Sequence, residues 1–247
     1  MLIIGAGAAG LMCAITAGQR GRRVLVVDHA NKVGKKILMS GGGRCNFTNL
    51  GTTPANYLSA NPHFAKSALA RYTPWDFIAL VEKHRIAWHE KELGQLFCDD
   101  SSKQIVRMLL DECAAAGVTV EANCAVQRVL RTPEGFSVHT ARGEVHAESL
   151  VVASGGLSIP SMGASGFGYE LARQFGHAVL PTRAGLVPLT LSGKHQEHYR
   201  DLAGVALPAV EARVGRQGFR AGLLFTHRGI SGPAILQISS YWQPGDD

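Results

Sequence analysis

The residues best suited to chemistry lie near the N-terminus, in Gly5-Ala6-Gly7-Ala8-Ala9-Gly10, a GxGxxG pattern. Its first glycine permits a tight turn from strand to helix, its second lets the backbone approach a pyrophosphate, and its third allows close helix–strand packing. The start of the following helix offers N–H donors and a positive dipole end. Asp28 ends the next apolar run, where a carboxylate would accept hydrogen bonds from an adenosine ribose. The pattern therefore predicts a dinucleotide-binding loop in preference to a glycine-rich structural turn.

A second glycine cluster, Gly41-Gly42-Gly43, lies between Lys35-Lys36 and Arg44-Cys45-Asn46. Three consecutive glycines are typical of backbone that passes against a flat or anionic ligand. Cys45 is a candidate redox thiol, but no second cysteine is expected near it to resolve a disulfide. Because cysteine is often a small buried hydrophobe, the structural interpretation of Cys45 is favoured.

The elements that must position these glycines are strands of a parallel sheet. Leu2-Ile3-Ile4 and Val24–Val27 are continuous apolar runs, and an Ala-rich helix over Ala8–Gln19 separates them. Apolar strands on both sides of a helix are what a buried parallel sheet requires, so this segment predicts one βαβ unit. A further buried strand, Leu150–Ala153, ends at Ser154-Gly155-Gly156.

The rest of the chain alternates predicted helices with short strands. Helices are predicted over 62–71, 74–84, from Ser101 or Ser102 to Ala116, and over 168–175, and strands over 118–121, 126–131, 136–140 and 144–147. Beyond about Pro181, strands punctuated by Pro and Gly dominate, over 186–191, 205–214 and 223–226. We therefore predict a Rossmann-like domain over residues 1–184 and the beginning of a mostly β domain over 185–247.

Composition restricts the function classes. The 247 residues are 46% hydrophobic, and the formal net charge is +6 with the charges scattered. The densest basic run, Arg20-Gly21-Arg22-Arg23, is interpreted as a solvated helix end, so no nucleic-acid partner is expected. Five cysteines without CxxC spacing and without a secretion signal predict a cytoplasmic location. No apolar stretch is long enough for a membrane span, and no hydrolase or P-loop motif is present.

With the glycine loop before it, the block from Ser40 to Asn49 resembles the BaiN/RdsA family of NAD(P)/FAD-dependent flavoproteins, which includes aminoacetone-oxidase-like and YhiN-type proteins. Further blocks resemble the family in the same order: Gly94–Phe97, Ser154–Pro160, Ala184–Leu189 and Leu224–Ala234. The resemblance implies an α/β fold, a Rossmann-like FAD-binding fold of the glutathione-reductase type, with a second, mostly β domain inserted after about Ala184.

By this resemblance, the first glycine loop would hold the FAD pyrophosphate and the second would run beside the flavin. Val126 would contact the adenine, and Ser154 keeps the hydroxyl of the family's usual threonine in an Ala-Thr-Gly-Gly turn. The implied cofactor-binding residues are Gly5, Gly7, Ala8, Ala9, Gly10, Asp28, Lys36, Ser40, Gly41, Gly42, Gly43, Arg44, Cys45, Asn46, Val126, Ala153, Ser154, Gly155 and Gly156. No catalytic side chain is assigned. His227 and Arg228 could face substrate or cap a strand, and His84 and His89 do not have the arrangement of metal ligands.

The implied activity is hydride transfer through FAD, from NAD(P)H or an oxidisable small molecule to an acceptor such as an enone or dioxygen. Relatives carry a C-terminal return that packs on the FAD domain, so we expect this sequence to be truncated and the flavin half to be incompletely enclosed. Two alternatives stay open. One is a nicotinamide-only dehydrogenase, in which the Ser40–Asn46 block would have no role, and the other is a non-catalytic or RNA-associated dinucleotide-binding fragment.

Overall fold

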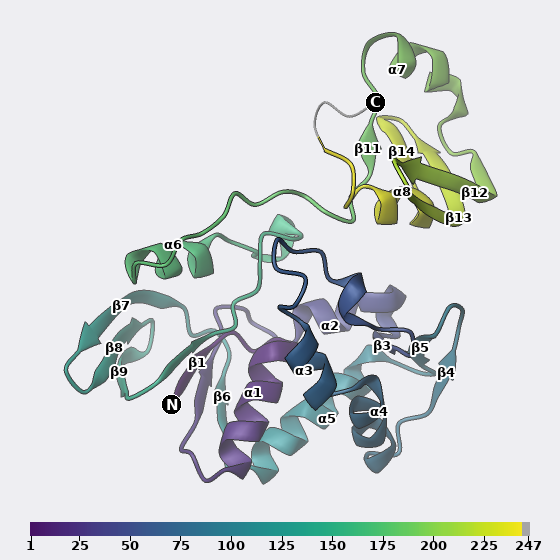
Figure 1. The fold of residues 1–247 in the computed structure, drawn as a ribbon. Helices are drawn as coiled ribbons and strands as arrows, with labels where there is room; N and C mark the ends of the chain where they lie inside the picture. The colour runs from purple at the N-terminus through teal and green to yellow at the C-terminus, as the bar shows by residue number, and fades with distance from the viewer. Residues whose placement is uncertain (244–247) are drawn as a thin grey trace. The chain divides into compact units, whose positions relative to one another are not determined.

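Three apolar runs and one more polar segment pair as a four-stranded parallel sheet (Figure 1). The computed structural model describes residues 1–243. The sheet has the order β10-β1-β2-β6 and consists of β1 (Leu2–Ile4), β2 (Leu25–Val27), β6 (Thr119–Glu121) and β10 (Leu150–Val152). Because β1 lies between β10 and β2, the loop that follows β1 opens at the carboxyl ends of three neighbouring strands.

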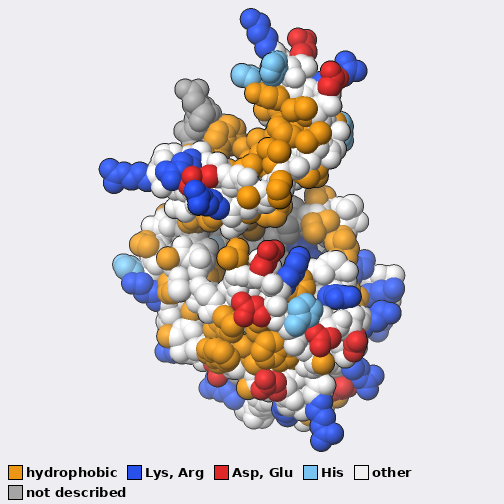
Figure 2. Space-filling model, turned by 90° about the vertical axis from the view of Figure 1, so that its right-hand side faces the viewer, with side chains coloured by type: hydrophobic (Ala, Val, Ile, Leu, Met, Phe, Trp, Pro, Cys, Tyr) orange, Lys and Arg blue, Asp and Glu red, His pale blue; other side chains and the backbone are white. Residues whose placement is uncertain are grey.

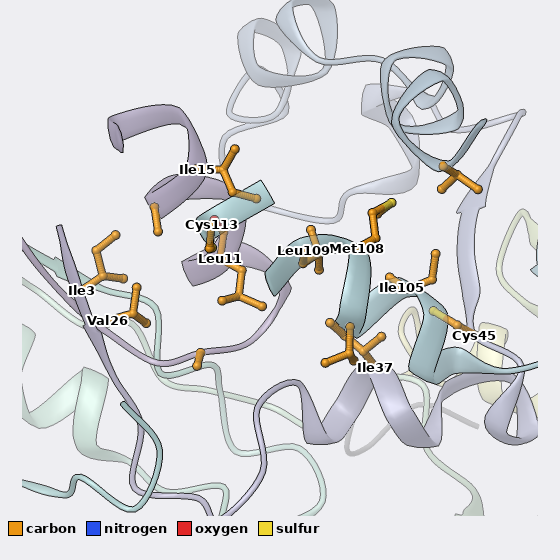
Figure 3. Close-up of a cluster of buried hydrophobic side chains, with 14 of the residues drawn as sticks. Ile3, Leu11, Ile15, Val26, Ile37, Cys45, Ile105, Met108, Leu109 and Cys113 are labelled. Carbon is orange, nitrogen blue, oxygen red and sulfur yellow. The ribbon is translucent and has the colours of Figure 1, made fainter. Parts of the chain in front are cut away.

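Side chains of the central strands alternate between two hydrophobic cores. Ile3 and Val26 belong to a core formed with α1 (Ala8–Gln19) and α5 (Ser102–Ala115). Figure 3 shows this core, with Ile3 and Val26 at one end of the cluster and Cys45 at the other. Because successive strand residues face opposite sides of a sheet, Leu2, Ile4 and Val27 enter a second core. The sheet is therefore covered on both faces, as its continuous apolar runs predict.

The second core is closed by an antiparallel meander and one helix. The meander consists of β7 (Val126–Thr132), β8 (Gly135–Thr140) and β9 (Gly143–Ala147), and the helix is α6 (Phe167–Gln174). These elements lie close to their predicted ranges. The helices predicted at Ala8–Gln19 and after Ser101 are also confirmed, and the Ser101 hydroxyl caps α5 by accepting from the Lys103 N–H at 3.3 Å.

The segment after β2 contains several short elements besides the helices predicted over 62–71 and 74–84, which correspond to α3 (Lys66–Arg71) and α4 (Pro74–Lys83). It also holds α2 (Lys35–Met39), the short η1 (Ser40–Gly43), β3 (Asn46–Asn49) and η2 (Pro54–Asn56). The polar strand β3 forms because it pairs with β5 (Gln95–Cys98), which also pairs with β4 (Trp88–Glu90). This β3-β5-β4 sheet depends on long-range pairing that a local pattern does not reveal.

The chain divides into unit 1, Met1–Val179, and unit 2, which begins at Leu180. After β10, unit 1 also contains η3 (Pro160–Met162). Unit 2 has an antiparallel sheet of order β11-β14-β13-β12, formed by β11 (Leu189–Thr190), β12 (Ala206–Val214), β13 (Gln217–Thr226) and β14 (Gly229–Ser231). Its helices are α7 (Gly193–Tyr199), η4 (Arg200–Leu202) and α8 (Pro233–Ile238).

Two predicted strands of unit 2 have different lengths in the structure. The strand expected over 186–191 is reduced to β11, and the one expected over 223–226 extends back to Gln217, because β13 pairs along most of β12. The last residues of the predicted mostly β domain, 244–247, lie outside the described residues. Among the helices of residues 1–243, none combines the length and the apolar character that crossing a membrane requires.

Candidate cofactor-binding site

A pocket of about 570 Å³ lies in unit 1, where β1, β2 and β10 end. This volume is in the range of pockets that hold small ligands and cofactors. Segments far apart in the sequence form its wall: the glycine loop after β1, the end of β2 with the start of α2, residues 124–126, residues 153–155 and residues 162–167. The pocket therefore lies outside the carboxyl ends of the parallel strands, where open α/β sheets bind their ligands.

Each of the three glycine positions of the first loop has its own structural explanation. A Cβ on Gly5 would overlap the Ala153 carbonyl, and the φ of Gly5 is +111°. A Cβ on Gly10 would overlap the Gly5 carbonyl, so close packing of backbone on backbone requires both of these glycines. Gly7 differs, because a Cβ there would meet no heavy atom of the described part of the chain within 4 Å. Gly7 lines the pocket, and the protein leaves the space beside it open.

The first turn of α1 presents backbone donors to this space. Gly7 is its N-cap and supplies no side-chain hydrogen bond, and the first turn contains no acidic residue. The first N–H groups of a helix have no partner within the helix, and the dipole makes this end positive. Ala8 and Ala9 line the pocket at this end. The arrangement suits the negative charge of a diphosphate.

Asp28 holds the glycine loop in place. Its carboxylate Oδ2 accepts from the Ala6 N–H at 2.7 Å, and its Oδ1 accepts from the Ala30 N–H at 2.8 Å. The side chain is 15% exposed and lines the pocket. Each carboxylate oxygen can accept more than one hydrogen bond. Asp28 can therefore brace the loop and still accept from a ribose. Its spacing from the glycine loop predicts the ribose contact but not these bracing hydrogen bonds.

Three lysines give the pocket wall a net positive charge. Lys32, Lys35 and Lys36 line it, and Asp28 is the acidic residue among the described lining side chains. The Nζ of Lys36 donates to the Ser158 hydroxyl at 2.8 Å and lies 3.6 Å from where a Cβ on Gly155 would be. Lys36 thus connects the start of α2 to the turn that follows β10. A flexible ammonium at this position can form a salt bridge with a phosphate.

The second glycine cluster is not part of the pocket wall. Its backbone is left-handed at Gly41, Gly42 and Gly43, with φ of 57°, 65° and 89°. A Cβ on Gly41 would lie 2.6 Å from a ring carbon of Phe97, so this glycine lets the turn pack on β5. At Gly42 and Gly43 a Cβ would meet no atom of residues 1–243 within 4 Å. The turn thus leaves an open surface beside two glycines, as the first loop does at Gly7.

Cys45 is buried at the base of this turn, with a φ of 56°. Burial raises the pKa of its thiol, and a hydrogen bond with Ser40 partly opposes the rise. Cys45 and Cys98 are both free cysteines. Cys98 follows Phe97, the β5 partner of Asn46, and burial together with the charge of Cys45 raises the Cys98 pKa to about 11. The sheet pairing that brings the two thiols together could not be read from their spacing in the sequence.

The structure gathers about half of the sequence-predicted cofactor residues around one pocket. Those that line it are Gly5, Gly7, Ala8, Ala9, Asp28, Lys36, Val126, Ala153, Ser154 and Gly155. Those that do not are Gly10, Ser40, Gly41, Gly42, Gly43, Arg44, Cys45, Asn46 and Gly156. The prediction missed other lining residues, among them His29, Lys32, Cys124, Met162 and Phe167. Only His29 and Lys32 had a sequence signal, because they closely follow Asp28.

The remaining sequence candidates lie elsewhere. His227 and Arg228 form the turn between β13 and β14, where the Thr226 hydroxyl accepts from the Arg228 N–H at 3.3 Å. His84 Nε2 is 2.6 Å from Glu112, and His89 Nδ1 is 2.7 Å from Asp99. No group of three or more His, Cys, Asp or Glu side chains within residues 1–243 could hold a metal ion.

The fold and the pocket define an α/β protein with a Rossmann-like dinucleotide-binding fold, which confirms the predicted fold class. The chain belongs to the HI0933-like family, whose Rossmann domain matches residues 1–229. It is 61% identical over 245 residues to the ribosomal RNA dihydrouridine synthase of Escherichia coli (strain K12), covering 99% of this chain and 61% of that protein.

Two further relatives share this pattern of partial coverage. The ribosomal RNA dihydrouridine synthase of Haemophilus influenzae (strain ATCC 51907) is 52% identical over 247 residues, covering 98% of this chain and 61% of that protein. The 3-dehydro-bile acid delta(4,6)-reductase of Clostridium scindens (strain ATCC 35704) is 29% identical over 250 residues, covering 98% of this chain and 60% of that protein. The chain therefore spans about three fifths of the length of these curated relatives.

Proposed function

We propose that this chain forms the FAD-binding part of a flavin-dependent oxidoreductase. The observation that carries the proposal is the open space beside Gly7, since the neighbouring glycines are required by packing and this one is not. A pyrophosphate that approaches the backbone explains a glycine at such a position. The positive helix end and the three lysines of the wall supply the charge that a diphosphate requires.

The residues present fit FAD in a specific way. The first turn of α1 and Lys36 would hold the pyrophosphate, and Asp28 would accept from the adenosine ribose. Val126, at the start of β7, would lie at the adenine end. The open surface beside Gly42 and Gly43 would take the flat flavin ring. When bound, FAD accepts a hydride from a reduced nicotinamide and donates it to an acceptor, while the chain binds, orients and shields the reacting groups.

The relatives suggest one class of acceptor. Dihydrouridine differs from uridine by two hydrogens across C5–C6, a bond conjugated to the C4 carbonyl. A 3-dehydro steroid with delta(4,6) unsaturation likewise has double bonds conjugated to a ketone. We propose that the substrate is a ring with such a conjugated double bond, and that it is a uracil of ribosomal RNA, because the dihydrouridine synthases are the more similar relatives.

An RNA substrate departs from the sequence-based expectation of a small molecule and no nucleic acid. On the face drawn in Figure 2, Lys and Arg side chains of unit 1 are interspersed with Asp and Glu. Such a distribution lacks the continuous basic stripe that is typical of nucleic-acid interfaces. The small-molecule enone therefore stays the alternative, and the two substrates are compared in the test.

The test uses the full-length protein. It is first mixed with FAD, and bound flavin is measured by absorbance after gel filtration. NADH or NADPH is then added without oxygen, and bleaching of the flavin reports hydride uptake. Finally, a ribosomal RNA transcript or a cyclic enone is added, and mass spectrometry measures the gain of two hydrogens. A protein that retains NADH but no FAD would refute the proposal and support a nicotinamide-only dehydrogenase.

A further inference from the structure

We propose that His89, oriented by Asp99, donates the proton that completes reduction of the conjugated double bond. The inference rests on the proposed function, and it deepens that function by assigning a catalytic residue. Sequence patterns assigned no acid–base pair. The structure forms one between β4 and the residue that follows β5, from a histidine and a carboxylate ten residues apart.

The need for an acid follows from the balance of the reaction. A hydride carries one hydrogen and two electrons to the carbon farther from the carbonyl. The electron pair of the double bond then moves toward the carbonyl, so the adjacent carbon must receive a proton. A reduced flavin supplies the hydride, and an acid of the protein supplies the proton, so the product gains two hydrogens. Positioned acids of this kind typically accelerate reactions by about 10²–10⁴-fold.

His89 and Asp99 have the geometry of an oriented acid. The imidazole Nδ1 lies 2.7 Å from Asp99 Oδ1, and the two side chains are 43% and 45% exposed. Within residues 1–243, no hydrogen bond occupies the Nε2 of His89. A carboxylate on Nδ1 orients the ring with its Nδ1–H toward Asp99. When the ring also carries a proton on Nε2, that proton can be transferred to the substrate carbon, and the neutral ring keeps its proton on Nδ1. The exposure of the ring allows a substrate to reach it.

The pair is connected to the second glycine cluster through β5. The His89 ring stacks on Phe97 at 6.2 Å between centroids, and Phe97 is the ring on which Gly41 packs. The Cys98 N–H, next to Asp99, donates to the Arg44 carbonyl at 3.0 Å. His89 thus contacts a residue that packs on the turn, and Asp99 is the chain neighbour of a residue that is hydrogen-bonded to it. The open side of this turn is the surface that we assign to the flavin.

The other histidines of unit 1 that face a carboxylate are less suited to this role. The Nε2 of His84 is occupied by Glu112, which also binds Lys83 at 2.6 Å. His29 lies beside Asp28, at the end of the pocket assigned to the adenosine ribose. His139 and His146 share Glu144 on the β8–β9 meander. Besides Asp99, a charged group near the ring that His89 stacks on is Lys91, whose Nζ lies 5.6 Å from the centre of the Phe97 ring.

The test separates the two half-reactions in the full-length protein with FAD bound. In His89→Gln, flavin reduction by NADH or NADPH should be unchanged, because that step needs no proton donor at the acceptor. Reoxidation of the reduced flavin by the substrate should slow by about 10²–10⁴-fold. Free imidazole should restore part of the rate in His89→Ala, because the site is exposed. Asp99→Asn should shift the pH profile of reoxidation, which a purely structural role would not do.

His139→Gln is the matched control, because His139 is also 43% exposed and also faces a carboxylate. A second readout needs no turnover: the ¹⁵N shifts of the His89 imidazole should show a protonated Nδ1 that changes in Asp99→Asn. Reoxidation of His89→Gln at the parent rate, without any effect of imidazole, would overturn the inference. If the parent protein binds no FAD or transfers no hydride, the proposed function itself fails, and the two failures are distinguishable.

Discussion

Replacing the glycines of the first loop one at a time separates folding from cofactor binding. Gly7 has φ −86° and ψ −174°, a conformation that alanine adopts without strain, and a methyl group there would meet no protein atom. Gly7→Ala should therefore fold and should gain about 0.4–1 kcal/mol from reduced freedom of the unfolded chain. The new methyl group would occupy the space assigned to the pyrophosphate. Overpacking of this kind costs about 1–3 kcal/mol, which corresponds to about 5- to 150-fold weaker FAD binding.

Gly10→Ala is the matched comparison. Its Cβ would overlap the Gly5 carbonyl, a backbone atom that cannot rotate away. We expect a loss of about 3 kcal/mol or more in the free energy of unfolding, seen as a melting temperature lower by about 6–12 °C. Calorimetry and FAD titration of both variants check the reasoning. Parent-like FAD affinity in a folded Gly7→Ala variant would refute the assignment of the pyrophosphate to this loop.

Individual contacts lead to three further predictions. Lys36→Met should weaken FAD or ADP binding by about 10-fold, measured by titration calorimetry, with an unchanged melting temperature because the bond to Ser158 is exposed. Hydrogen bonds from Lys83 and His84 lower the pKa of Glu112 below its ordinary 4.5, so its contribution to stability is present above that pH and is lost as the pH falls through the lowered pKa. Urea unfolding of Glu112→Gln should therefore show a lower free energy of unfolding at neutral pH and a smaller decrease of it in acid. The same decrease with falling pH in both proteins would contradict this. Burial raises the pKa of Cys98 and of Cys113 to about 11, so mass spectrometry should find iodoacetamide on the half-buried Cys13 first, with Cys98 and Cys113 labelled only in urea.

Elements with a strong local pattern could be predicted from the sequence. The helix over Ala8–Gln19 has its predicted bounds because a glycine loop precedes it and Gly21 follows its last turn. Strands β1 and β2 could be predicted because they are mostly buried on both faces and are therefore apolar throughout. The β3-β5-β4 sheet was not visible, because Asn46–Asn49 is polar and is held by pairing with residues about fifty positions later. Local propensity carries no information about such pairing.

The same distinction applies to the site. Gly5, Gly7 and Asp28 could be found because one βαβ unit brings them together within a short stretch of chain. The turn after β10 could be found only through the family resemblance, since its sequence is distant from the loop that it contacts. Met162 and Phe167 carried no signal, because their place in the pocket wall depends on how the segment after β10 folds back. The pair of His89 and Asp99 needed the β4–β5 register, which places the two side chains within hydrogen-bond distance.

The two glycine clusters differ in how much of their geometry the protein itself determines. Around Gly7, packing of Gly5 and Gly10 and two hydrogen bonds to Asp28 hold the loop without any ligand. Around Gly42 and Gly43, the open side has no atom of the described residues within reach of a Cβ, and the turn is held mainly from the side of Phe97 and Cys45. A preformed site loses less conformational freedom on binding than one that its ligand must order. ADP alone should therefore bind this chain, whereas tight binding of the flavin half should depend on what covers the open side of the second turn.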